Sequence, residues 1–147
     1  MMRIIVGIDG SGQSAAAAAV AAKLAEQIGA KVIAVHSFGL LERFDPYKGH
    51  VPSSERRAVV ADRLESWTAS LADLDLDLER LVVDGNAVEA LLGAVEHEDD
   101  LIVVGRRGAG SGSGSRASTT LGSTSSQLAQ RSPVPVLIVP DPTEDQP

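Results

Sequence analysis

Two segments near the C-terminal third of the chain combine glycine with hydroxyl-bearing side chains. The segment Gly105–Gly108 (GRRG) is followed by a Gly/Ser-rich run and then by Leu121–Ser125 (LGSTS). A glycine-rich turn that leads into a helix presents backbone N–H groups and the positive end of the helix dipole to an anion. Hydroxyl donors and positive charge come from Ser123, Thr124, Ser125, Arg106, Arg107 and Arg116. These residues predict a phosphate-binding site, although the same composition is also typical of a flexible linker with solvated arginines.

Asp9 is a second candidate for ligand binding, because it directly follows an apolar run. The segment Arg3–Asp9 (RIIVGID) is short and almost entirely apolar. A carboxylate at the end of a buried strand is costly unless it finds partners. Asp9 therefore either accepts hydrogen bonds from a ribose hydroxyl or a base amine, or it caps the first helix or a turn.

Other motifs argue against several enzyme classes. The segment Gly10–Ala15 matches the G-x-G-x-x-G/A fingerprint, but the second strand ends in His36 and Ser37 without the acidic residue that a dinucleotide ribose needs. The chain contains no P-loop and no nucleophile elbow. We interpret His36 and His97 as structural or solvated, and the acidic run Glu96–Asp100 as a solvated turn rather than a metal site.

The elements that must position these residues alternate along the chain. Five apolar runs predict strands at Arg3–Asp9, Lys31–His36, Asp77–Val83, Leu101–Gly105 and Val134–Val139. Helical periodicity predicts helices at Ala15–Ile28, Glu55–Leu71, a short segment that Asn86 caps, and Thr120–Gln130, with Ser14 as the N-cap of the first helix and Gly29 ending it. Apolar faces are expected at Ala17, Val20, Ala21, Leu24 and Ile28 in the first helix and at Val60, Leu64, Trp67 and Leu71 in the second. Phe38–Ser53 is irregular and either covers a site or is an unconstrained insertion.

This order predicts an α/β fold: an open, five-stranded, mainly parallel sheet with helices on both faces (Rossmann-like). The less apolar start of Asp77–Val83 places that strand at an edge. Ligands of such sheets bind outside the carboxyl ends of the strands. The loops after the first and fourth strands, which carry Asp9 and Gly105–Gly108, are therefore expected to lie at one site.

Composition limits the possible partners. The chain has 147 residues, no cysteine, three histidines and a formal charge of −7, with 3% aromatic residues. An acidic balance and few aromatics disfavour nucleic-acid binding. No apolar stretch approaches the ~18 residues of a membrane span, and the N-terminus does not resemble a signal peptide. We expect a cytoplasmic protein with no membrane partner.

The ordered set of motifs resembles the universal stress protein family, in its nucleotide-binding type. The resemblance extends from Arg3 to Val139 and rests on VGIDGS (6–11), AVHSF (34–38), VVDGNAVEALL (82–92), IVVGRRG (102–108) and LGSTSSQLAQRSPVPVLIVP (121–140). It implies a family domain over residues 1–140, a polar tail over 141–147 and the strand order 3-2-1-4-5. It also implies ATP, with Mg²⁺, as the ligand and a homodimer through antiparallel pairing of the last strand, Val134–Val139.

The resemblance also implies site residues. Gly105, Gly108 and the Gly122–Ser123 pair match the G-x2-G-x9-G-[S/T] signature, except that thirteen residues separate Gly108 from Gly122. The implied nucleotide-binding residues are Gly7, Ile8, Asp9, Ser37, Val104, Gly105, Arg106, Gly108, Gly122, Ser123, Thr124 and Ser125, with Asp9 near the adenosine and the hydroxyls near the phosphates.

Two functions remain open after the sequence analysis. The first is an ATP-binding protein of stress response or regulation, which hydrolyses ATP slowly at most, because no base or nucleophile accompanies the phosphate cradle. The second is the same fold without nucleotide, acting as a dimeric interaction module for an unknown protein partner. The lengthened Gly/Ser loop favours the second.

Overall fold

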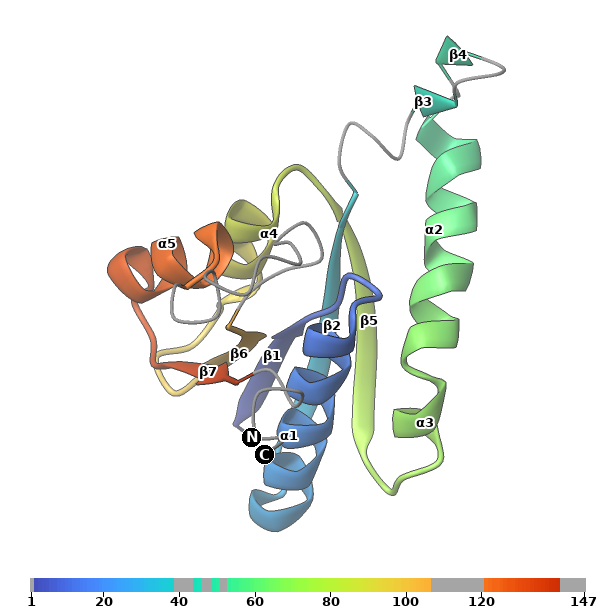
Figure 1. The fold of residues 1–147 in the computed structure, drawn as a ribbon. Coiled ribbons are helices and arrows are strands. Elements are labelled where there is room, and N and C mark those ends of the chain that lie inside the picture. The colour runs from blue at the N-terminus through green and yellow to red at the C-terminus, as the bar shows by residue number, and fades with distance from the viewer. Residues whose placement is uncertain (1, 39–43, 46–48, 51–52, 107–120, 141–147) are drawn as a thin grey trace, which may run out of the picture.

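The computed structural model describes residues 2–38, 44–45, 49–50, 53–106 and 121–140 (Figure 1). The five predicted strands are β1 (Arg3–Gly7), β2 (Lys31–Phe38), β5 (Asp77–Asp84), β6 (Leu101–Gly105) and β7 (Val136–Val139). The helices are α1 (Gly12–Ile28), α2 (Ser53–Trp67), α3 (Ala69–Ala72), α4 (Ala87–Ala94) and α5 (Ser123–Arg131). Two short strands, β3 (Phe44–Asp45) and β4 (Gly49–His50), pair antiparallel.

The main sheet has the order β5-β2-β1-β6-β7, and every neighbouring pair is parallel. In chain order this is 3-2-1-4-5, so the predicted fold class and strand order are confirmed, and β5 lies at an edge as expected. Apolar side chains on both faces of β1 and β6 explain why these strands are central, since each strand must fill a core on two sides.

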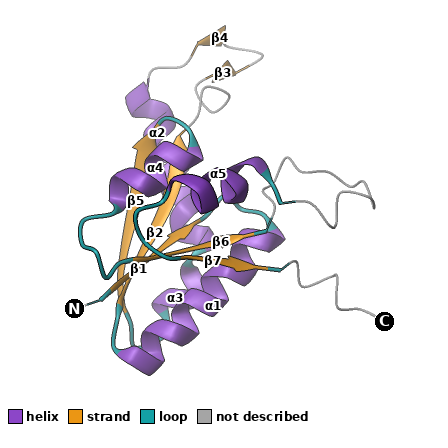
Figure 2. Ribbon diagram, turned by 90° about the vertical axis from the view of Figure 1, so that its left-hand side faces the viewer, coloured by secondary structure: helices purple, strands orange, loops and turns teal. Residues whose placement is uncertain are grey.

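Helices cover both faces of the sheet (Figures 1 and 2). On one face, the buried alanines of α1 pack against β1 side chains such as Ile4 and Val6, and the same cluster contains Leu64 of α2 and Leu71 of α3. On the other face, Leu91 of α4 and Leu128 of α5 lie in a second cluster of buried residues with β1 and β6 side chains. The predicted two-sided packing is therefore confirmed.

Two details of the first helix differ from the prediction. Ser11, rather than Ser14, is the N-cap of α1: its side-chain oxygen accepts a hydrogen bond from the Ser14 backbone N–H at 3.1 Å. Ser14 lies inside the first turn and is buried. Ile28 is 51% exposed, whereas the buried residues of α1 are Ser14 and small alanines, which let the helix lie close to the sheet. Gly29 ends the helix with φ of 68°, as predicted.

The helix predicted over Glu55–Leu71 is interrupted at Thr68. The Thr68 hydroxyl donates to the carbonyl of Leu64 at 2.7 Å and accepts from Arg80 Nε at 2.7 Å. Thr68 is fully buried, so these bonds fix the junction between α2 and α3 against β5. The segment Phe38–Ser53, predicted to be irregular, contains the β3–β4 pair within its described residues.

Several further element bounds differ from the prediction, three of them as follows. β1 ends at Gly7, so Asp9 lies outside the strand. α5 begins at Ser123 rather than Thr120, and Thr120 lies outside the described residues. β7 begins at Val136, directly after Pro135, which has no backbone N–H to donate to a sheet.

The acidic run Glu96–Asp100 is not entirely a solvated turn, because Asp100 is 1% exposed. Its carboxylate accepts from Arg3 Nη2 at 2.8 Å and from the backbone N–H groups of Glu96 and His97 at 2.8 and 3.0 Å. Burial raises the pKa of Asp100, but the Arg3 hydrogen bond, the two backbone donors and the Arg3 charge outweigh it and lower the pKa to about 2. Arg3 and Asp100 thus join the start of β1 to the turn before β6.

Candidate functional site

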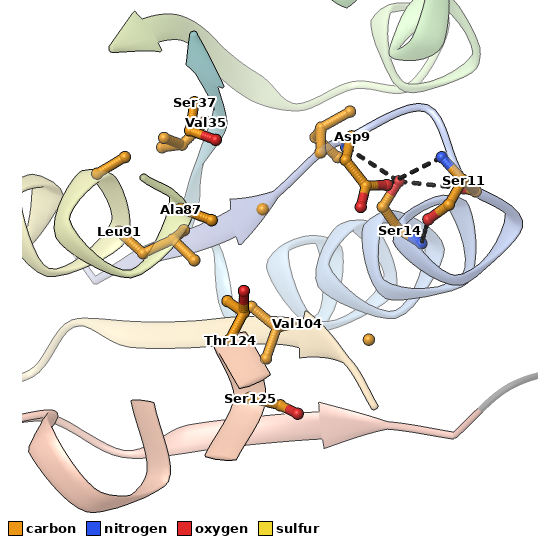
Figure 3. A pocket seen from close by; sticks show the side chains of 14 residues that line it. Asp9, Ser11, Ser14, Val35, Ser37, Ala87, Leu91, Val104, Thr124 and Ser125 are labelled. Atoms are coloured by element: carbon orange, nitrogen blue, oxygen red, sulfur yellow. Dashed lines mark hydrogen bonds between the residues drawn. The ribbon is translucent and has the colours of Figure 1, made fainter. Parts of the chain in front are cut away.

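A pocket lies at the carboxyl ends of β1, β2 and β6 (Figure 3). About 540 Å³ of space, which includes open solvent at its mouth, lies between the lining residues. The N-terminal turns of three helices border it, through Ser14 of α1, Ala87 of α4 and Thr124 of α5. Its lining consists of Gly7, Ile8, Asp9, Ser11, Ser14, Val35, Ser37, Ala87, Ala90, Leu91, Val104, Gly105, Thr124 and Ser125.

Most of the predicted site residues come together in this pocket. Those that line it are Gly7, Ile8, Asp9, Ser37, Val104, Gly105, Thr124 and Ser125. Arg106, Gly122 and Ser123 are described but do not line it. Gly108, like Arg107 and Arg116, lies outside the described residues. The loops after the first and fourth predicted strands are therefore adjacent, as the topology predicted.

The sequence analysis missed six lining residues, namely Ser11, Ser14, Val35, Ala87, Ala90 and Leu91. Ser11 and Ser14 lie within five residues of Asp9 in the sequence, so their closeness to it was a usable signal. The start of α4 had a signal as well, because Asn86 was recognised as its cap. Nothing in the sequence, however, places α4 next to the carboxyl end of β2.

Asp9 forms the turn that was one of its two predicted roles. Its Oδ1 atom accepts a hydrogen bond from the Ser11 backbone N–H at 2.9 Å. The Ser14 hydroxyl accepts from the Asp9 backbone N–H at 3.2 Å and donates to the Ser11 carbonyl at 3.1 Å (Figure 3). This network holds an exposed carboxylate at the pocket rim in a fixed turn, so the structural role does not remove it from the site.

The backbone of Arg106 fixes the opposite wall. Its carbonyl accepts from the Gly122 N–H at 2.8 Å and from the Ser125 hydroxyl at 2.7 Å, while its N–H donates to the Val139 carbonyl at 2.8 Å. These bonds join β6, β7 and the start of α5. Gly122 is the N-cap of α5 and offers no side-chain cap, so the first-turn N–H groups of this helix lack the side-chain acceptor that Ser11 provides in α1.

Glycine at position 105 permits the close approach of α1 to β6. A Cβ atom at Gly105 would lie 3.0 Å from Cβ and 3.1 Å from the carbonyl oxygen of Gln13. Because backbone atoms cannot swing aside as a flexible side chain can, a larger residue here would displace the first turn of α1. That turn carries Ser14 and borders the pocket.

Three apolar side chains gather on one side of the pocket. Val35, Ala87 and Leu91 lie together in Figure 3, on the opposite side from the Asp9 turn. Asp9 is the only ionisable residue of the lining, so within the described part of the chain an anion at this site would rely on helix N-termini and hydroxyls. Among the described residues, no group of three or more His, Asp or Glu side chains is arranged to hold a metal ion. Nor is any described helix both long and apolar enough to span a bilayer.

Comparison with known proteins identifies the family of this chain. The family model described as "Universal stress protein family" matches residues 1–140. A universal stress protein of Thermus aquaticus, from the 3′ region of a QAH/OAS sulfhydrylase, is 33% identical over 140 residues, which cover 92% of this chain and 96% of the relative.

Solved structures share this fold. A universal stress protein in complex with cAMP is 25% identical, with a TM-score of 0.64 and coverage of 95% of this chain and 97% of that one. Hypothetical protein MJ0577 has the same fold at 20% identity, with a TM-score of 0.74 and 94% coverage of both chains. The Archaeoglobus fulgidus universal stress protein in complex with dAMP is 18% identical, with a TM-score of 0.61 and coverage of 94% and 97%. On the family model and the Thermus relative together, the chain belongs to the universal stress protein family.

Proposed function

We propose that this chain is a nucleotide-binding protein of stress response or regulation and that its pocket takes an adenine nucleotide, with ATP as the physiological ligand. The observation that carries the proposal is the pocket itself, where the carboxyl ends of three parallel strands meet the first turns of three helices. Sites of this kind in open α/β sheets bind nucleotides. The similar protein solved with cAMP, at 25% identity, supports the choice of an adenine base.

The chemistry of the lining suggests how the nucleotide lies. The apolar side, with Val35, Ala87 and Leu91, suits the flat adenine ring, and Ser37 offers hydrogen bonds to its edge. Asp9, at the rim, suits the ribose hydroxyls, since a carboxylate accepts two hydrogen bonds well. The phosphates then lie toward Thr124 and the start of α5, where backbone N–H groups and hydroxyls favour negative charge.

We assign five further predicted residues to the phosphate end of the proposed site. Two of them lie at the end of β6 and three at the start of α5, namely Gly105 and Arg106, and Gly122, Ser123 and Ser125. Mg²⁺ is bound mainly by phosphate oxygens and one or two carboxylates. The lining supplies one carboxylate, Asp9, and it faces the ribose rather than the phosphates in this arrangement. We therefore propose that Mg²⁺ enters with ATP rather than occupying a separate protein site.

The proposed activity is binding, with occupancy as the regulatory signal. Hydrolysis at ordinary enzymatic rates of ~1–10³ s⁻¹ requires a positioned base or nucleophile. The lining offers Asp9 alone for that role, and its Oδ1 atom already accepts a hydrogen bond within the turn. We expect at most slow hydrolysis.

We also propose that the protein is a homodimer formed through β7. In the main sheet, this strand pairs with β6 on one side and is last in the strand order on the other. Leu137 in its centre is 38% exposed. An edge of this kind is stabilised when a second chain pairs with it. Sedimentation of Leu137→Lys should show a monomer where the unaltered chain shows a dimer, and a dimer that survives the substitution would reject β7 as the interface.

Calorimetric titration of a matched pair of variants tests the nucleotide proposal. Ala87→Trp places a large ring in the pocket, whereas Gly93→Trp places the same ring at an exposed position of α4, where a Cβ would meet nothing within 4 Å. We expect Mg·ATP and cAMP to bind the unaltered chain and Gly93→Trp at one per chain, and Ala87→Trp to lose binding. Equal binding by both variants would move the nucleotide out of this pocket.

A further inference from the structure

The side chain of Trp67 lies directly behind the turn that carries Asp9. Gly10 in this turn has a φ of +83°, and a Cβ atom built on it would lie 2.6 and 2.7 Å from Cζ2 and Cε2 of Trp67. The indole therefore packs against the backbone of the turn with no room for a side chain between them. Trp67 does not line the pocket, so any effect on a ligand would pass through this contact.

His36 connects the same indole to Ile8, which lines the pocket. The two rings meet edge to face, with centroids 5.3 Å apart and planes at 70°. Nδ1 of His36 lies 2.7 Å from the carbonyl oxygen of Ile8, and since a carbonyl only accepts, this bond places a proton on Nδ1. The Ile8 N–H also donates to the Val35 carbonyl at 2.8 Å. Ile8 is thus bound to β2 through both of its backbone polar groups.

Trp67 is itself held firmly from α2 and β5. It is the last residue of α2, and the next residue is the fully buried Thr68. The hydroxyl of Thr68 bonds both the Leu64 carbonyl and Arg80 Nε at 2.7 Å. Rotation of the helix end would break these bonds, so they fix the backbone that carries the indole behind the Asp9 turn.

We infer that Trp67 is a positioning residue of the nucleotide site, which holds the Ile8–Ser11 turn in the shape that lines the pocket. The inference rests on the proposed function. It also couples the site to α2. A change of the turn on ligand binding must alter the contact with the indole, and a displacement of α2 must shift the turn. Loss of groups that support ligand-contacting residues lowers affinity by about 10–100-fold at metal sites. We expect a loss of about tenfold for Trp67→Ala.

The test compares Trp67→Ala with Leu71→Ala by calorimetric titration with AMP and Mg·ATP. Leu71 is buried in the same cluster but belongs to α3 and is not part of the pocket lining. We expect Trp67→Ala to raise the Kd about tenfold, Leu71→Ala to lower stability without changing the Kd, and Trp67→Phe, which keeps an aromatic ring at the turn, to restore most of the affinity.

A second readout does not depend on any variant. Trp67 is the only tryptophan of the chain, so the protein's indole emission reports the surroundings of this one side chain. We expect AMP to shift its intensity or wavelength with the same Kd as the calorimetry. Binding by the unaltered chain with no change in emission, and with equal Kd for Trp67→Ala, would overturn the inference and leave the proposed function intact. No binding by the unaltered chain would overturn both.

Discussion

Removal of the Asp100 carboxylate tests whether the acidic turn before β6 stabilises the fold. In Asp100→Asn, the side chain keeps its shape but loses its charge, so Arg3 Nη2 loses the ionic partner 2.8 Å away, while Glu96 remains 3.5 Å from Arg3 Nη1. The lowering of the Asp100 pKa from 3.8 to about 2 corresponds to about 2 kcal/mol of folding free energy at neutral pH. The partly buried Arg3 guanidinium, left without that charge, adds to the loss. We expect the free energy of unfolding to fall by about 2–4 kcal/mol.

Urea unfolding followed by circular dichroism measures this loss, and its pH dependence identifies the cause. Because the folded-state pKa of Asp100 is lower than its unfolded value, the ionic contribution is complete above about pH 5 and declines as the pH falls from 3.8 toward 2. The difference between the unaltered chain and Asp100→Asn should be equal at pH 7 and pH 5, and smaller by about 1 kcal/mol at pH 3. The exposed neighbour provides the control, since Asp99→Asn should stay within about 0.5 kcal/mol. A difference under about 0.5 kcal/mol at pH 7, or one that does not change down to pH 3, would refute the reasoning.

Two further substitutions test the turns around the pocket. Gly10→Ala places a side chain at a φ of +83° and against the Trp67 ring, so unfolding free energy should fall by about 2 kcal/mol or more, and by less when Trp67→Ala removes the clash; equal losses in both backgrounds would argue against the contact. Asn86→Ala removes the 2.8 Å bond from the Glu89 N–H, so thermal unfolding should show a loss of about 0.5–2 kcal/mol; an unchanged midpoint would mean that the cap does not stabilise α4.

The sequence predicted the parts of the fold that depend on local pattern. Each main-sheet strand follows from an apolar run, and the edge position of β5 follows from its charged start at Asp77. The strand order came from the family resemblance rather than from hydropathy. The N-cap of α1 was misplaced because Ser11 and Ser14 are both good caps, and only the Asp9 turn decides between them.

Features that depend on distant contacts were not predicted. Asp100 is one acid among several in its run, and its burial depends on Arg3, 97 residues earlier. Trp67 was predicted to face the core, but its contact with Gly10 joins elements whose approach no local pattern encodes. The same holds for Ala87 and Leu91, whose place in the pocket depends on how α4 crosses the sheet.

Identification of the nucleotide bound to the protein tests the central proposal most directly. The purified chain is denatured, and the released small molecules are separated and identified by mass; the emptied and refolded chain is then titrated with Mg·ATP, AMP and cAMP. We predict an adenine nucleotide in the released fraction or, if none is retained, saturable binding of at least one of the three at one per chain. No released nucleotide together with no binding at millimolar ligand would contradict the account and favour a dimeric interaction module.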